Sequence, residues 1–331
     1  MAHMIENNML AYKGQEPWHG LGFRVNENAT GAEMLATAGM EWRVQRRALA
    51  MRPGNGDTQT MLTAQLDGFR AIVRSDTNTV FQVASDRYQP VQNVDIVEFF
   101  REYCEAGHAR METIGGLRDG AVVWALARLN GGSTATLPGN DELRGYMLLA
   151  TSHDGSLKTI GKPTQVRVVC HNTLTAALGE HRGQNVFAMR HVRKFDQSAK
   201  DDARRVMGMA IEQIQETNSV AAQLAAVTID HAGWMEFMTK LMGESLLDPK
   251  TAELSRTAQA IQDATFSSPG SAMVSARGTL WGAVNGVTWF ADHAARSRSE
   301  SNRMFSAWFG TNESLKVSAV QAAMEMAGIG K

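Results

Sequence analysis

The chain changes its hydrophobic pattern near residue 190. Before that point, short stretches alternate apolar and polar residues with a period of two, which is typical of half-buried strands. Examples are WRVQRRALAMR (42–52), GFRAIVRS (68–75) and AVVWALARL (121–129). Turn-forming residues such as PGNGD (53–57) separate these stretches. We therefore expect mostly antiparallel hairpins in the first part of the chain.

Two helices are predicted to interrupt these strands. In NVDIVEFFREYCEAG (93–107) the apolar residues recur every three to four positions, Asn93 can cap the first turn and Gly107 can end the helix. Cys104 falls on the apolar face of this helix and is predicted to be a structural thiol. The segment NTLTAALGEH (172–181) is predicted to open the second helix.

After residue 190 the helical period dominates. The segment 198–229 places an apolar stripe along a single long amphipathic helix that begins with a Ser198-x-x-Asp201 capping pattern. Four more helices are expected, and they lie within 233–243, 249–266, 278–296 and 312–328. The predicted fold class is α+β. Residues 1–190 form an α+β unit with an antiparallel hairpin sheet and basic patches, and residues 191–331 form an all-α unit that could mediate oligomerisation.

Charge is segregated along a chain that is nearly neutral overall. The 33 basic and 34 acidic residues give a net charge of -1, so no global field attracts nucleic acid or membrane. Residues 40–75, however, carry six arginines against three acidic residues, and residues 151–206 carry ten Lys/Arg against five Asp/Glu. Residues 207–275 reverse the balance, with three against eight. Any binding to phosphate must therefore come from local basic patches.

The expected setting is the cytoplasm. The chain has only two cysteines, which form no disulfide framework. The first residues lack the charged and apolar regions of a signal peptide. No apolar stretch approaches the roughly 20 residues that span a bilayer, so no membrane partner is expected.

One stretch, residues 151–180, gathers residues that could carry chemistry. Cys170 could act as a nucleophile with His153 or His171 and Asp154, or these four residues could hold a metal. Neighbouring residues of a strand point to opposite faces, which argues against pairing Cys170 with His171. The dipeptide Asp154-Gly155 instead predicts a hairpin turn of type I′. No catalytic residue, metal ligand or cofactor is assigned, and an enzyme centred on His153 and Asp154 is kept as the third hypothesis.

Basic residues are the leading candidates for function. On an open antiparallel sheet face they could follow a phosphate backbone, while Trp42 and Tyr88 either stack on bases or belong to the core. The predicted nucleic-acid-binding residues are Arg43, Arg47, Lys158, Lys162, Arg167, Arg193 and Lys194. Trp18 and His19 in EPWHGLG (16–22) are predicted to form an interaction loop, with Trp18 as a plug of its own core as the alternative.

Several strings together resemble the phage/plasmid-like protein family. These are PWHGLG, DRYQPVQN (86–93), SHDGS, RVVCHNTL and GTLWGAVNGVTWFADH, and the similarity runs from about residue 1 to 325. The family carries a domain of unknown function, so the resemblance implies a mobile-element protein in a bacterial host and supplies no catalytic residues.

The order of predicted elements is also similar to that of single-strand annealing proteins, which form rings that hold DNA in a basic groove. This likeness is one of fold alone. The leading hypothesis is a non-enzymatic protein that binds, and could anneal, single-stranded DNA and forms a homo-oligomer through its helical unit. The alternative is a protein-interaction module, such as a host-defence inhibitor or a structural phage protein.

Overall fold

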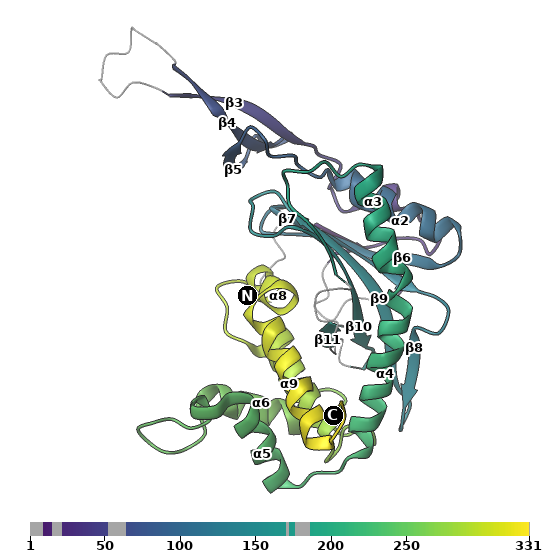
Figure 1. Ribbon diagram of the computed structural model, residues 1–331, viewed down its shortest axis with the longest axis vertical. Helices are drawn as coiled ribbons and strands as arrows, with labels where there is room; N and C mark the ends of the chain where they lie inside the picture. Colours follow the sequence, from purple (N-terminus) through teal and green to yellow (C-terminus); the bar gives the residue numbers. More distant parts are fainter. Residues whose placement is uncertain (1–8, 15–21, 52–63, 170–171, 176–185, 331) are drawn as a thin grey trace.

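A large sheet forms the centre of the molecule. The computed structural model describes residues 9–14, 22–51, 64–169, 172–175 and 186–330 (Figure 1). Nine of the strands described form one sheet in the order β11-β10-β9-β7-β6-β1-β2, with β12 paired to β10 and β8 paired to β9. The strands are β1 (Leu10–Tyr12), β2 (Phe23–Arg24), β6 (Ala109–Leu117), β7 (Val122–Leu129), β8 (Thr134–Leu137), β9 (Asp141–Ser152), β10 (Thr159–Arg167), β11 (Asn172–Thr175) and β12 (Phe187–Met189). All their pairings are antiparallel except β1 with β2.

A second, three-stranded sheet projects from the upper end of the molecule in Figure 1. It consists of β3 (Val44–Met51), β4 (Ala64–Arg74) and β5 (Val80–Ser85), with β4 in the middle. We call it the arm. Both of its pairings are antiparallel, as the alternating pattern of this region predicts.

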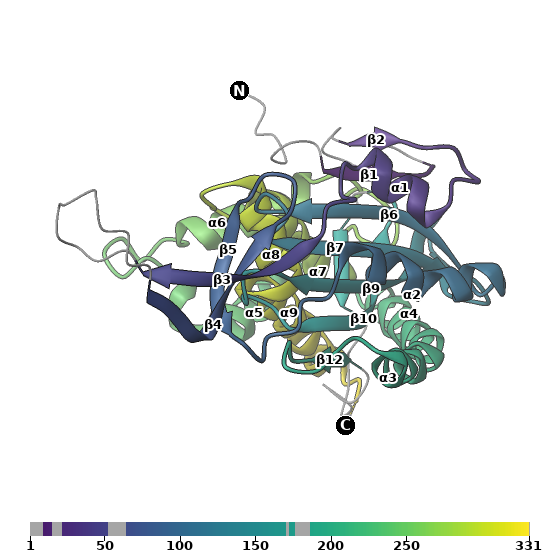
Figure 2. The ribbon, with the colours of Figure 1, turned by 90° about the horizontal axis from the view of Figure 1, so that it is seen from above.

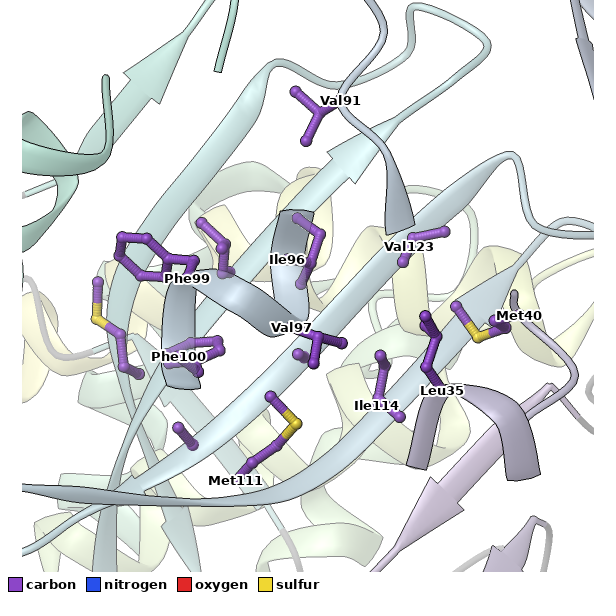
Figure 3. Close-up of a cluster of buried hydrophobic side chains, with 14 of the residues drawn as sticks. Leu35, Met40, Val91, Ile96, Val97, Phe99, Phe100, Met111, Ile114 and Val123 are labelled. Carbon is purple, nitrogen blue, oxygen red and sulfur yellow. The ribbon is translucent and has the colours of Figure 1, made fainter. Parts of the chain in front are cut away.

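Helices cover one face of the large sheet. These are α1 (Gly31–Thr37), α2 (Asn93–Glu105) and α3 (Gln197–Gly208). Ile96, Phe99 and Phe100 of α2 are fully buried against inward-facing residues of the strands, including Ile114 and Val123 (Figure 3). Burying one such side chain contributes about 1.5–3 kcal/mol. In Figure 2, which is a view from above, α1 and α2 lie nearer the viewer than the strands, and the yellow C-terminal helices lie behind the strands.

The opposite face of the sheet is also buried. There α8 (Glu300–Phe309) packs on alternate residues of the same strands, and the ring of Trp308 meets Trp124 edge to face at 4.6 Å. Both faces of β7, β9 and β10 are covered, but only β7 and the middle of β9 carry nearly continuous apolar runs, whereas β10 includes Lys162 and Arg167. The sequence pattern of these three strands does not by itself reveal that both faces of the sheet are covered.

The remaining helices form a core of their own next to the sheet. They are α4 (Ala210–Ala226), α5 (His231–Met242), a 3₁₀ turn η2 (Gly243–Leu246), α6 (Arg256–Ser267), α7 (Leu280–Trp289), a π-helical turn η3 (Phe290–Ala294) and α9 (Thr311–Ala327). Their core centres on Trp234, Phe237, Leu280 and Val287. The α6 and α7 backbones approach so closely that a Cβ at Gly286 would lie 2.0 Å from Thr265 Oγ1. None of the helices described is long and apolar enough to cross a bilayer.

The mixture of antiparallel sheets and helices confirms the coarse α+β prediction, while the division at residue 190 stays a prediction. Three local predictions are corrected. Asn172–Thr175 forms the strand β11 instead of a helix, because the edge of β10 offers it a pairing partner. The long helix is two helices, α3 and α4, interrupted after Gly208, a residue of low helix propensity. Asp196 caps α3 by accepting a hydrogen bond from Ala199 N at 3.1 Å, in place of the predicted Ser198.

The two Asp-Gly turns differ from each other. Asp119-Gly120, a dipeptide typical of two-residue hairpins, lies between β6 and β7, but the connection has four residues, and Arg118, Asp119 and Gly120 all have positive φ (53°, 55° and 86°). At Asp154-Gly155 only the glycine has positive φ, and six residues separate β9 from β10. The hairpin therefore exists, but its turn is not of type I′. The Asp154 carboxylate instead accepts a hydrogen bond from Ser156 N at 2.9 Å.

Candidate nucleic-acid interface

One face of the arm is open to solvent. Alternation and strand register place Arg47 of β3, Phe69 of β4 and Val83 of β5 on the same side, since Arg47 pairs with Ala71 and Ala71 pairs with Val83. We define the open face as Arg43, Gln45, Arg47, Phe69, Val80 and Val83. Its large apolar side chains are unusually exposed: Phe69 by 47%, Val80 by 55% and Val83 by 53%. On the opposite face of the arm, Val44 and Ile72 are buried against the body of the molecule, whereas Arg46 and Ala48 are exposed.

Two arginines on this open face keep their charge uncompensated. Arg47 donates from Nη1 to Asn78 Oδ1 at 2.7 Å and from Nη2 to Gln45 Oε1 at 2.7 Å, and both partners are neutral. Arg43 is exposed and has no ion pair within the part of the chain that the structure describes. A guanidinium held by neutral amides remains available to a phosphate, and it has already lost some rotamer freedom.

Backbone contacts bring three distant segments together at the base of the arm. Gln89 N donates to His191 O at 2.5 Å, and His191 Nε2 lies 3.0 Å from Leu157 O. Gln82 on the arm donates from Nε2 to His153 O at 2.8 Å. The segments 86–89, 153–158 and 190–194 therefore meet, although more than 60 residues separate the first from the second.

These segments carry exposed cations, which we call the arm-base cluster: Arg87, Lys158, Arg190 and Lys194. None of the four forms an ion pair with a carboxylate that the structure describes. Asp86 and Asp154 lie on the same segments, but they are fewer, and Asp154 is already engaged by Ser156 and by Arg118 at 3.9 Å. The basic stretches of the sequence thus contribute, in part, to one region.

Three of the predicted binding residues have a different environment. Lys162 is 5% exposed and pairs with Glu313 and with Trp308 O, and Arg167 is 3% exposed and pairs with Asp141. Arg193 is exposed, but Asp202 Oδ2 lies 3.0 Å from its Nη1. Lys162 and Arg167 lie on β10, where helices cover both faces of the sheet. They hold those helices in place, and neither faces solvent.

The predicted aromatic stackers also change. Trp42 and Tyr88 are 7% and 8% exposed and belong to the core, with the Arg74 guanidinium 4.5 Å from the Trp42 ring. Phe69 is the exposed aromatic residue of the arm, and the sequence analysis missed it. Its place opposite the core depended on the pairing of β4 with β3, which the sequence does not state.

Of the residues that suggested catalysis, His153 belongs to a buried structural cluster. His153 has no exposed surface; its Nε2 lies 3.1 Å from Asn93 Oδ1, and its ring packs against Trp42 and Phe81. Burial lowers the pKa of His153 to about 3, so the ring is neutral. Among the residues described, no group of three or more His, Cys, Asp or Glu side chains could hold a metal ion. The geometry therefore lends no support to a site built on His153 and Asp154.

Four of the strings that carried the resemblance contact each other in pairs. Tyr88 donates to Ser152 O at 3.0 Å, which joins DRYQPVQN to SHDGS. Thr173 N donates to Asp292 Oδ2 at 2.7 Å, which joins the end of RVVCHNTL to GTLWGAVNGVTWFADH. Lys316 donates to the other Asp292 oxygen at 2.7 Å. These motifs thus act as junctions between elements of the fold.

Some predictions cannot be placed. Trp18, His19, Cys170 and His171 lie outside the residues that the structure describes. The interaction loop and the two-sided argument about Cys170 and His171 therefore stay predictions.

Comparison with known proteins identifies a family whose function is unknown. A family profile described as DUF932, a domain of unknown function, matches residues 80–308. This match crosses residue 190 and includes β5, the arm-base cluster and most of the C-terminal helices. No curated protein and no solved structure matches the chain.

Proposed function

This chain belongs to the DUF932 family, a family of unknown function, and we propose that it binds single-stranded DNA along the open face of the arm and the arm-base cluster. One observation carries the proposal. Exposed cations from separate parts of the sequence lie on the open face of the arm and at its base, and the open face carries the exposed aromatic residue Phe69. Cations that follow a backbone, together with an aromatic platform for bases, make up the usual apparatus for single-strand binding.

The exposed apolar surface favours single strands over duplex. In a duplex the base faces are stacked on each other, so an aromatic side chain cannot reach them. In a single strand each base can stack on an aromatic side chain, which contributes about 1–3 kcal/mol per base. The near-zero net charge of the chain does not oppose binding, since the attraction comes from a local group of cations.

The cations are tested by replacing Arg43, Arg47, Lys158 and Lys194 together with alanine. At about 0.7 units of salt slope per phosphate contact, we expect the slope of log affinity against log salt to shrink by about 3, and affinity to fall at least about tenfold. Fluorescence anisotropy with a labelled oligonucleotide measures both. The matched control replaces Lys240, Lys250, Arg256 and Arg298, four exposed cations of the C-terminal helices. Equal loss in the two variants, or wild-type binding that ignores salt, would refute the proposal.

The aromatic platform is tested by Phe69→Ala. Because Phe69 is half exposed, its removal should leave folding intact while it weakens single-strand binding by about 5- to 100-fold and leaves the salt slope unchanged. Phe23→Ala, at a residue exposed by 46% on β2, is the control for loss of an exposed ring. If Phe69→Ala reduced the salt slope and left the affinity for single strands unchanged, Phe69 would have a role other than stacking.

A second candidate function rests on the same exposed apolar residues. Val80, Val83 and Phe69 could instead receive a partner protein, in keeping with the interaction-module alternative. In that case the Phe69 variant would lose partner binding while the four-cation variant kept it. The phage or plasmid association, annealing activity, homo-oligomer formation and cytoplasmic location remain proposals.

A further inference from the structure

The C-terminal helices contain a pocket that the proposed function does not use. It has a volume of about 520 Å³ and lies between the start of α5, the end of α6 and the loop before α7. That volume is within the range of small-molecule sites, roughly 300–1,000 Å³. Figure 1 places α5 and α6 at the end of the molecule opposite the arm. The pocket is therefore separate from the candidate nucleic-acid interface.

The pocket walls are held in place by the backbone. Ile229 N donates to Gly278 O at 2.9 Å, and Leu280 N donates to Val227 O at 3.0 Å. These bonds fasten the linker between α4 and α5 to the segment that leads into α7. The opening is thus formed before any ligand enters, which lowers the entropic cost of binding.

Aromatic rings line the pocket in a row. The His231 ring stacks on Trp234, with centroids 6.2 Å apart and planes inclined by 18°, and the Phe266 ring lies 6.0 Å from Trp234 at an inclination of 49°. Trp234 is 2% exposed, and its Nε1 makes no hydrogen bond with any residue described. Phe266 is 56% exposed. The exposed ring of Phe266 and the exposed His231 therefore offer flat aromatic surface at the pocket, on which a planar ligand can stack.

Two charged side chains define the rest of the ligand. Arg277 is exposed and forms no ion pair within the described ranges. Asp230 caps α5 with one carboxylate oxygen, which accepts from Gly233 N at 2.9 Å. Its other oxygen can accept a hydrogen bond from an amino group. The pocket therefore offers stacking surface, an acceptor for an amine and a cation for an anion.

Two other surface hollows lack this combination. The arginines in the hollow near β12 include Arg193 and Arg205, and both already pair with Asp202. In the hollow near β8, Arg110 and Arg128 lie within 4 Å of carboxylates. Neither hollow carries a row of aromatic rings. Of the three, the pocket beside α5 is the one suited to a planar anion.

We propose that this pocket binds a nucleoside monophosphate whose base carries an exocyclic amino group. The base stacks on Phe266 and His231, its amino group donates to Asp230, and its phosphate pairs with Arg277. The proposal does not depend on single-strand binding by the arm.

The test is calorimetric titration of the full chain with adenosine monophosphate, uridine monophosphate and adenosine. We expect saturable binding of adenosine monophosphate, with weaker binding of uridine monophosphate, whose base lacks the amino group. Phe266→Ala should lower the affinity for adenosine monophosphate by about tenfold or more. Arg277→Ala should lower it about tenfold, to the level of adenosine, and leave adenosine binding unchanged.

Arg256→Ala is the matched control, because it removes an exposed arginine of α6 outside the pocket lining. The absence of saturable binding at millimolar nucleotide would overturn the proposal, as would a Phe266→Ala variant that binds as tightly as the wild type. The four-cation arm variant should keep its nucleotide affinity. The two proposals, single-strand binding by the arm and nucleotide binding by the pocket, are therefore tested by separate variants.

Discussion

Replacing Asp141 with alanine is expected to lower the free energy of unfolding by about 3–5 kcal/mol, because it leaves a buried guanidinium without its counter-ion. The Asp141 and Arg167 side chains are 0% and 2% exposed, and their charged atoms lie 2.8 Å apart. Ser275 also donates to Asp141 Oδ2 at 2.6 Å. The pair thus joins β9 and β10 of the sheet to the loop before α7. Urea denaturation followed by circular dichroism measures the change.

Two further variants separate the ion pair from other effects. Asp141→Leu combined with Arg167→Met should recover most of the lost stability, since removal of both charges abolishes the unpaired guanidinium. Asp202→Ala breaks the exposed pair with Arg193, whose side chains are 37% and 44% exposed, and should cost no more than about 1 kcal/mol. A loss below about 1 kcal/mol for Asp141→Ala would contradict a structural role for Arg167 and would return it to the candidates for ligand binding.

Acid is expected to destabilise the protein through His153. Burial lowers the pKa of the folded-state imidazole to about 3, whereas the unfolded chain has a pKa of about 6.5. Below pH 6.5 the unfolded chain therefore binds a proton that the folded protein excludes. Stability is complete above this pH and falls by about 1.4 kcal/mol per pH unit on acidification, which is about 2 kcal/mol by pH 5.

His153→Phe isolates this contribution. The phenyl ring suits a site where Trp42 and Phe81 lie 5.6 and 5.5 Å away, and it cannot take up a proton. The variant should lose less stability than the wild type between pH 6.5 and pH 5, by about 2 kcal/mol over that range. His191 has a pKa that burial also lowers, so part of the acid sensitivity persists. The control is His108→Phe, at an exposed histidine. Denaturant titrations at each pH give the free energy of unfolding of each variant.

Identical acid sensitivity in the wild type and in His153→Phe would show that His153 reaches solvent. It would then be a candidate for chemistry once more. The same measurement therefore bears on the enzyme hypothesis as well as on stability.

The local elements were predictable where local patterns dominate. The period of two in GFRAIVRS (68–75) and the three-to-four spacing in 93–107 predicted β4 and α2. A signal was also available for α1, which the sequence analysis did not include: Thr30 and Glu33 form a capping box, with Glu33 N donating to Thr30 Oγ1 at 3.2 Å. The strand β11 was unpredictable because its pairing partner, β10, decides its conformation.

The candidate interface was predicted in part. Arg43 and Arg47, two of the predicted binding residues, have the same parity and lie on the same side of the arm, because side-chain alternation is a local property. Lys162 and Arg167 could not be distinguished from solvated cations. Their burial depends on Glu313 and Asp141, and Glu313 lies 151 residues away from Lys162. The pocket beside α5 was also invisible, since its rings come from separate helices.

The sequence by itself determined many of the strands, most helices and the segregation of charge, because each depends on neighbours within a few residues. The tertiary structure alone decided which cations face solvent and which are buried in ion pairs. It also decided that both faces of the large sheet are covered and that the open face belongs to the arm. The physical reason is that the cost of desolvating a charge depends on what packs around it, and that packing is made by residues far away along the chain.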